Sequence, residues 1–305
     1  MNSFLQPAAV IAALALAIGL RFLPKLRGYQ FTAWIIVAVV AGMIYPSQLL
    51  KVGDFDLRNK WLILFIVQAV MFGMGTQMKL SDFKGVAKMP FAVFIGVFGQ
   101  FTIMPLVGWG LTKVLHFEPE IAAGIILIGS CSAGLASNVM AYLAKANLAL
   151  SITMTSVTTA LAPIMTPLWM KILAGELVEV KAFHMMMEII KMVIVPIGAA
   201  LLHDYLTFAK PRGRRIVYGT ALTGVLWLLF ISFGGWSWFK ANVPADALPW
   251  IGVFGFVLAA TVAGVIYHHA TKALPVLPKL MPIASMFGIV YFTAVTTAAG
   301  RDNLL

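Results

Sequence analysis

Polar side chains interrupt a long apolar stretch of this sequence, between Leu127 and Pro167. The interruption consists of Ser130, Cys131, Ser132, Gly134, Ser137 and Asn138. Inside a bilayer, a helix can break only where protein or a water-filled cavity satisfies the freed backbone groups. Broken helices at membrane depth commonly hold an ion or a substrate. The pattern predicts a discontinuous helix at about 131–137, with Ser132, Gly134 and Leu135 lining the break and a substrate cavity beside it.

Hydroxyl groups follow the break on one face of the next apolar segment. Ser151 and Thr155 are four residues apart, which places both side chains on the same side of a helix. Together with Ser137 and Asn138 they form an all-oxygen set, the kind that a hard cation prefers. A soft metal would need several Cys or His ligands, which this stretch lacks. We therefore expect a cation site here, with no other metal and no organic cofactor.

A third polar group, the amide of Gln100, lies midway along another apolar segment. An unpaired amide is costly at membrane depth, so Gln100 is either an ion ligand or one partner of an interhelical hydrogen bond.

Two simpler interpretations apply to the small and hydroxyl residues around the break. Small residues let helices pack closely, and Ser and Thr hydroxyls often bond to their own helix carbonyls. The amide of Asn138 favours the site, because packing alone does not require it.

Composition identifies the class of protein. The chain has 305 residues, of which 61% are hydrophobic and 11% charged. This composition predicts an all-α polytopic membrane protein and excludes a soluble enzyme domain. The net charge of +11 does not indicate nucleic-acid binding, because the basic residues lie in short loops between apolar runs. About ten apolar segments can be drawn: 5–24, 31–47, 61–78, 89–113, 121–145, 148–173, 182–206, 214–238, 249–270 and 279–299.

The distribution of Lys and Arg predicts how the segments are oriented. Alternate loops share one side of the membrane, and the more basic set faces the cytoplasm. This set includes Lys79, Lys84, Lys88, Lys210, Arg212, Arg214, Arg215 and Lys272. We therefore expect the loop at 207–214 to be cytoplasmic and the loop at 239–248 to lie outside. His203, His268 and His269 fall at the ends of apolar segments, where we expect them to be solvated.

Several motifs resemble those of the bile acid:sodium symporter family, in its bacterial type. They are FGMGTQMKLSDF (72–83), Gln100 with IMP (103–105), ASNVMAYLAKANLALS (136–151), TSV (155–157) and LAGELVE (173–179). The resemblance covers about residues 31–206. It implies ten helices in two inverted repeats, with two broken helices crossing in a core domain. It also implies that Ser137, Asn138, Ser151 and Thr155 match ligands of one sodium ion, and that Gln100 matches a ligand of a second.

The resemblance divides the chain into four parts. Residues 1–30 are an extra N-terminal helix, and residues 31–206 are the family-like first repeat and the start of the second. Residues 207–278 are an inserted helix pair, and residues 279–305 resemble the family's seventh helix. The second crossover, with its Glu-x-x-x-Gln-Asn motif, has no counterpart in the sequence. The second repeat is therefore expected to be incomplete, in a truncated version or a fragment of a longer transporter; the alternative is a divergent design with ten helices.

The function implied is sodium-coupled symport of a small amphipathic organic anion, such as a bile acid or a carboxylate metabolite. The expected partners are sodium, that anion and the lipid bilayer, and the expected location is the inner (plasma) membrane. Alternatives are a truncated, non-transporting membrane protein that binds an anion or a partner, and a related anion exporter. An enzyme is not expected, because no paired carboxylates or Ser/His pair lies at membrane depth.

Overall fold

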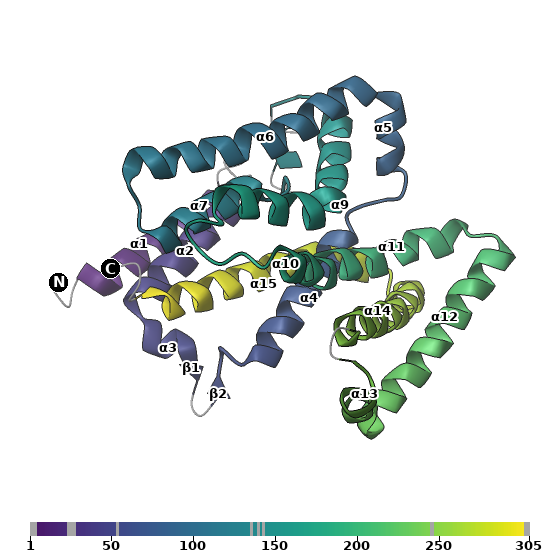
Figure 1. Cartoon of the computed structure of the whole chain (residues 1–305). Coiled ribbons are helices and arrows are strands. Elements are labelled where there is room, and N and C mark those ends of the chain that lie inside the picture. The colour runs from purple at the N-terminus through teal and green to yellow at the C-terminus, as the bar shows by residue number, and fades with distance from the viewer. Residues whose placement is uncertain are drawn as a thin grey trace. The chain divides into compact units, whose positions relative to one another are not determined.

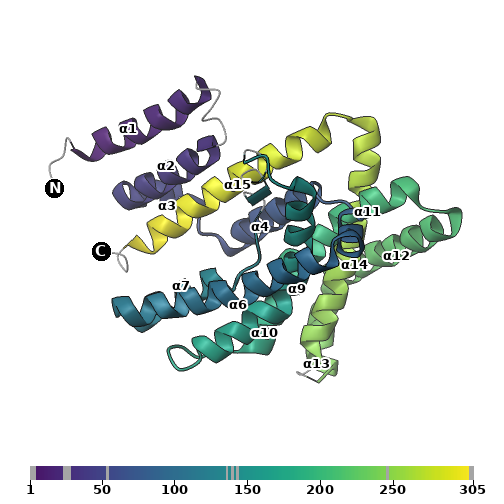
Figure 2. The same ribbon diagram turned by 90° about the horizontal axis from the view of Figure 1, so that it is seen from above.

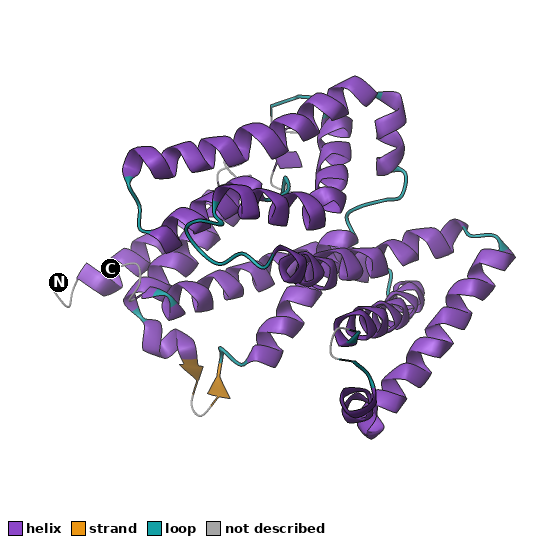
Figure 3. Cartoon of the chain, in the orientation of Figure 1, coloured by secondary structure: helices purple, strands orange, loops and turns teal. Residues whose placement is uncertain are grey.

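Helices make up nearly all of the described chain (Figures 1 and 3). The computed structural model describes residues 5–22, 29–52, 55–134, 137–138, 141, 144–244 and 247–301. Strands in these ranges are limited to a short antiparallel hairpin of β1 (Lys51–Val52) and β2 (Phe55–Asp56). The all-α class predicted from composition is therefore confirmed.

Helices long and apolar enough to cross a membrane number six among the described residues. They are α6 (Pro90–Leu115), α9 (Leu148–Leu173), the run Ala182–Phe208, the run Pro211–Asn242, α14 (Leu248–Ala273) and α15 (Leu277–Ala299). Shorter apolar helices occupy the other predicted segments: α1 (Leu5–Gly19), α2 (Gln30–Ile44), α4 (Lys60–Gly75) and α7 (Pro119–Ser130). The chain is a multi-pass membrane protein, whereas ten crossings and an inverted repeat stay predictions.

Proline sets where many of these helices start. It stands at the first or second position of α3 (Pro46–Leu50), α6, α7, α12 (Pro211–Phe230), α14 and α15. Its fixed φ and missing N–H suit a first helical turn, where that N–H would have no partner. The long helices bury only 11–33% of their most apolar windows inside the protein. Their outward apolar side chains, such as Phe91 and Phe287, are thus left for contact with lipid.

One compact unit comprises residues 1–74 and 276–305. Here α2 packs against both α1 and α15, which lie beside it in Figure 2. Ser285 of α15 donates a hydrogen bond to the Val70 carbonyl (3.2 Å), and Tyr291 donates one to the Leu57 carbonyl (2.8 Å). Beside the hairpin, hydrogen bonds from Arg58 hold the pKa of the Asp56 carboxyl below its usual value.

The second unit comprises residues 75–275. It begins with a short 3₁₀ turn η3 (Asp82–Lys84) and α5 (Gly85–Lys88), after which α6, α7 and α9 pack against one another. The run Ala182–Phe208 consists of α10 (Ala182–Ile189), a π-helical turn η4 (Ile190–Ile194) and α11 (Val195–Phe208). The run Pro211–Asn242 consists of α12, the π-helical turn η5 (Ile231–Gly235) and α13 (Trp236–Asn242). Helix α14 packs against both α11 and α12.

One of the histidines at the contact between α11 and α14 is buried, although all three histidines at helix ends were predicted to be solvated. His268 is only 3% exposed, and its Nδ1 lies 3.3 Å from Nδ1 of His203. The Thr271 hydroxyl lies 3.3 Å from the same nitrogen of His203. The prediction of solvated histidines is wrong for His268, because the two helices pack together along their ends. His269, on the neighbouring position of α14, is exposed as predicted.

Candidate functional site

The helix break begins where α7 ends, at Ser130. Cys131 is extended (φ −77°, ψ 161°), and residues 132–134 have no regular structure. Helix α9 supplies partners for the freed backbone. The Thr166 hydroxyl donates to the Ser130 carbonyl (2.8 Å), and the Ala133 N–H donates to the Thr158 hydroxyl oxygen (3.3 Å). The segment can leave the helix inside the protein because these bonds replace helical ones.

Helix α6 holds the break from another side. The Gln100 amide nitrogen donates a hydrogen bond to the Cys131 carbonyl (3.0 Å). Helices α6 and α7 also pack closely just before the break. A Cβ on Gly129 would lie 2.6 Å from the Met104 carbonyl oxygen, and a Cβ on Gly108 would lie 3.2 Å from the Ile125 carbonyl oxygen. Gln100 therefore makes the interhelical hydrogen bond that the sequence left open as one of its two roles.

The amide oxygen of Asn138 contacts the hydroxyl groups of two other predicted site residues, Ser151 and Thr155. The Ser151 hydroxyl donates to Asn138 Oδ1 at 2.6 Å, and the Thr155 hydroxyl lies 3.2 Å from the same atom. Thr155 also lies within 3.1 Å of the Ser151 carbonyl, so its single proton serves one acceptor or the other. Thr155 is 5% exposed, whereas Asn138 and Ser151 are half-buried. The structure thus gathers oxygen atoms from the residue that follows the break and from the first turns of α9.

The remaining predicted residues belong to the break itself. The Ser137 hydroxyl donates to the Gly134 carbonyl (2.7 Å), and the Ser137 backbone N–H bonds to the same oxygen (3.0 Å). Ser132 is half-buried, and nothing lies within 4 Å of the place where a Cβ on Gly134 would stand. Leu135 lies outside the described residues. Ser137 is therefore bonded locally among the described residues, separate from the Asn138, Ser151 and Thr155 cluster.

Two hydroxyls of α9 were not among the predicted residues. Thr166 supports the break through Ser130, and it stands between Pro163 and Pro167 in the helix. The sequence did contain a signal for this role, namely a hydroxyl residue between two prolines in a helix. Each proline leaves one carbonyl of the helix without its N–H partner, so the backbone there is irregular. The buried Ser156 hydroxyl has no hydrogen-bond partner among the described residues. Neither feature identifies a ligand by itself.

The chemistry of the cluster is neutral and oxygen-based. Asn138, Ser151 and Thr155 offer an amide oxygen, two hydroxyl oxygens and the adjacent Ser151 carbonyl. Oxygen ligands of this kind suit a hard cation such as Na⁺, and no thiolate or imidazole competes for a soft metal within the cluster. In the part of the chain that the structure describes, no group of three His, Cys, Asp or Glu residues is placed to hold a metal. The chemistry of the set therefore suits a hard cation better than a soft metal.

Comparisons with known proteins show which family the chain resembles. The family model described as "Sodium Bile acid symporter family" matches residues 62–237. The "Uncharacterized sodium-dependent transporter YocS" of Bacillus subtilis is 37% identical over 70% of the chain and 63% of the relative. The "Probable sodium/metabolite cotransporter BASS1, chloroplastic" of Arabidopsis thaliana is 35% identical over 62% of the chain and 47% of the relative.

A mammalian relative is also similar. The "Ileal sodium/bile acid cotransporter" of Homo sapiens is 28% identical over 68% of the chain and 63% of the relative. The chain thus spans between 47% and 63% of the length of these three curated relatives. The names of all three describe transporters, in agreement with the prediction that the chain is not an enzyme.

Proposed function

The chain belongs to the sodium bile acid symporter family, and from this we propose that it serves sodium-coupled transport of a small amphipathic organic anion across a membrane. Bile acids and carboxylate metabolites are the two anion classes we favour. The plasma membrane is the proposed location. The relatives named as sodium-dependent or sodium cotransporters support the coupling ion, and the human and plant names support organic substrates.

The observation that carries the proposal is the cluster at Asn138. Its amide oxygen accepts the Ser151 hydrogen bond at 2.6 Å and lies 3.2 Å from the Thr155 hydroxyl. In our proposal these oxygens, with Ser137, bind one sodium ion, and Gln100 contributes to a second. The organic anion binds beside the break, near Ser132, Gly134 and Leu135. Sodium would draw the end of the break toward α9, because its ligands come from residues 137–138 and from Ser151 and Thr155 of that helix.

The first prediction concerns sodium binding by Asn138→Ala. A hydrogen bond or ion contact of a buried amide contributes about 1.5–3 kcal/mol when a charge is involved, which corresponds to roughly a tenfold to hundredfold loss of affinity. We expect sodium, but not potassium, to raise the melting temperature of the purified chain, since a ligand stabilises the state that binds it. In Asn138→Ala this sodium-dependent rise should occur only at much higher concentrations.

Asn242→Ala is the matched control, because Asn242 is an exposed asparagine whose amide bonds to the Trp238 carbonyl (2.8 Å). It should keep the sodium response of the parent chain. A normal sodium response in Asn138→Ala would remove this cluster from the proposal. The substrate class is tested separately, by uptake of a bile acid and of small carboxylates into proteoliposomes under a sodium or a potassium gradient.

A further inference from the structure

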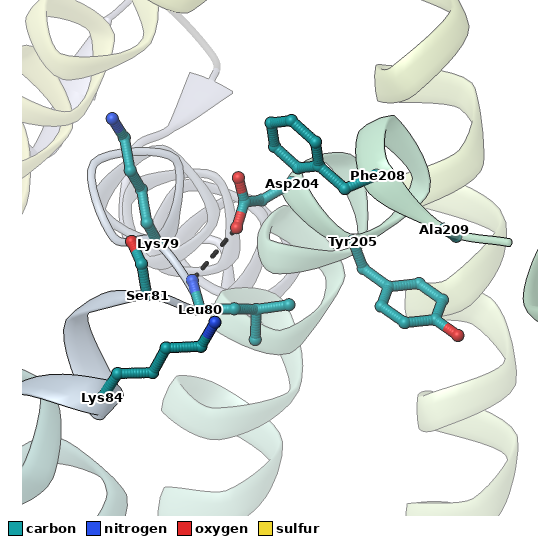
Figure 4. A pocket seen from close by; sticks show the side chains of 8 residues that line it. All are labelled: Lys79, Leu80, Ser81, Lys84, Asp204, Tyr205, Phe208 and Ala209. Carbon is teal, nitrogen blue, oxygen red and sulfur yellow. Dashed lines mark hydrogen bonds between the residues drawn. The ribbon is translucent and has the colours of Figure 1, made fainter. Parts of the chain in front are cut away.

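A pocket of about 540 Å³ lies in the second unit, and none of its lining residues belongs to the break. One wall is the turn that follows Gly75, and the other is the end of α11 (Figure 4). Its lining residues are Lys79, Leu80, Ser81, Lys84, Asp204, Tyr205, Phe208 and Ala209. Figure 4 shows the two lysines on one side and the aromatic side chains on the other. The pocket therefore combines cationic groups with an apolar wall.

The carboxylates near the pocket are engaged by backbone groups. Asp204 accepts a hydrogen bond from the Leu80 N–H (3.1 Å), drawn dashed in Figure 4. Asp82 accepts one from the Lys79 N–H (2.7 Å). These two bonds fix the turn and place its lysines at the pocket. Within the described ranges, no carboxylate lies within 4.0 Å of the amine of Lys79 or Lys84. Both amines are available to an anion.

More positive charge adjoins the pocket at the start of α12. A Cβ on Gly213 would lie 2.4 Å from the Tyr205 hydroxyl, so the chain between Arg212 and Arg214 passes directly beside the pocket's aromatic wall. Lys210 directly precedes α12, and Arg215 lies near the start of that helix. With Lys79 and Lys84, these basic groups outnumber Asp82 and Asp204. An anion in the pocket is favoured by the charge of its whole surroundings.

The position of the pocket indicates that its ligand has an apolar part as well as a negative charge. The membrane-capable run Ala182–Phe208 ends at the pocket, and its last residue is 83% exposed. Leu80 (41%) and Tyr205 (39%) are also partly exposed there. Exposed apolar side chains next to lysines at the end of a spanning helix are typical of the bilayer interface, where headgroups and acyl chains meet. A small hydrophilic anion would leave this apolar wall unused.

We propose that the pocket binds the headgroup of an anionic phospholipid. Lys79 and Lys84 contact the phosphate, and Ser81 can donate its hydroxyl. The first part of an acyl chain packs on Tyr205 and Phe208. Basic pockets beside membrane helices on the cytoplasmic side bind anionic headgroups by this combination of contacts. The proposal does not depend on transport, and it assigns a lipid to a region separate from the Asn138 cluster.

The test is a titration of short-chain phosphatidylglycerol, and of short-chain phosphatidylcholine, into the purified full chain in neutral detergent. Native mass spectrometry counts bound lipid. We expect the chain to prefer phosphatidylglycerol and the pair Lys79→Gln, Lys84→Gln to bind it about thirtyfold more weakly. Each lysine near an anionic lipid contributes roughly fivefold, so the two together give that factor.

The matched control is the pair Lys171→Gln, Lys240→Gln, which removes the same charge from two exposed lysines outside the pocket. It should keep the lipid preference. The pair Lys79→Arg, Lys84→Arg should keep it too, and it serves as the second test if the glutamine pair does not fold. Equal losses in the glutamine pairs, loss in the arginine pair, or displacement of the lipid by inorganic phosphate at similar concentrations would overturn the proposal. Phosphate displacement would identify a free-anion site instead.

Discussion

Cys131 is the single cysteine of the chain and the first residue after α7. Its side chain is exposed in the structure, while its carbonyl accepts the Gln100 hydrogen bond (3.0 Å). The residue thus reports on the break without belonging to the proposed sodium ligands. Replacing Cys131 with serine gives a chain without any thiol, which makes labelling at this position simple to measure.

We predict that a small polar maleimide labels Cys131 and that sodium changes the labelling rate. Sodium bound between Asn138 and α9 stabilises one arrangement of the break, and a ligand shifts such an equilibrium through its different affinity for the two states. Labelling is followed by mass spectrometry in sodium and in potassium, with Cys131→Ser as the unlabelled reference. Equal rates in the two salts would mean that ion binding does not rearrange the break.

Residue types identified the Asn138 cluster from sequence, because an amide and aligned hydroxyls are conspicuous within apolar segments. The Gln100 contact was predicted only as one of two roles. The bonds from Thr166 to Ser130 and from Ala133 to Thr158 were not predicted, since each joins backbone and side-chain atoms of residues 36 or 25 positions apart. Such pairs depend on how two helices pack, which local sequence does not specify.

Helices α6 and α7 approach each other closely at their glycines. A Cβ on Gly129 would lie 2.6 Å from the Met104 carbonyl oxygen and 3.3 Å from the Pro105 Cα. Both neighbours are backbone atoms, which cannot move aside as a flexible side chain could. The helix therefore needs glycine at this position to bring its C-terminal end, and the break that follows, against α6.

Gly129→Ala should destabilise the chain by about 1–3 kcal/mol, the usual range for overpacking. Gly124→Ala is the matched control on the same helix, because nothing lies within 4 Å of its Cβ position. Alanine there should be neutral or stabilising by roughly 0.5–1 kcal/mol, since it is the better helix former. Melting temperatures in detergent compare the two variants. A Gly129→Ala chain as stable as Gly124→Ala would contradict the close approach.

Hydropathy predicted the positions of the helices well, but it did not predict the irregular turns inside them. The segment predicted at 182–206 matches the run Ala182–Phe208, yet the π-helical turn at Ile190–Ile194 was not predicted. The run Pro211–Asn242 contains a similar irregularity, where Gly234 has φ 92°. Apolar periodicity reveals a helix and its approximate ends, whereas an extra residue in one turn changes the pattern too little to be seen.

For the whole molecule, the orientation in the membrane remains a prediction from charge. A single crossing by the run Pro211–Asn242, which is kinked at Phe233 and Gly234, would place the connections before and after it on opposite sides. Lys210, Arg212, Arg214 and Arg215 lie at its start, which favours the cytoplasm for that end. The lipid pocket at the end of α11 would then face the cytoplasmic leaflet.

We predict that a protease site inserted between Phe208 and Pro211 is cut only from the cytoplasmic side, and that one inserted between Asn242 and Leu248 is cut only from outside. Both insertions fall between helices, where added residues disturb packing least. Cleavage is measured in intact cells and in inverted vesicles. External cleavage at the first site would reverse the orientation.

Domain organisation is the least predictable level. The compact units divide the chain near 75 and 275, whereas the four predicted segments rest on likeness to family parts and stay a prediction. Inverted repeats arise from pairing between segments far apart in sequence. The match to the family covers residues 62–237 and the relatives are longer than the chain, so this level requires more than the sequence of one chain.

The Thr158 hydroxyl oxygen has a consequence for biosynthesis. It is the acceptor for the Ala133 N–H, and the two residues are 25 positions apart. A ribosome adding about 5–20 residues per second needs roughly one to five seconds to make that interval. During this time the nascent chain lacks the oxygen that its break requires. We therefore expect residues 131–134 to stay in contact with water or with protein until α9 has been made, because irregular backbone is not stable in lipid.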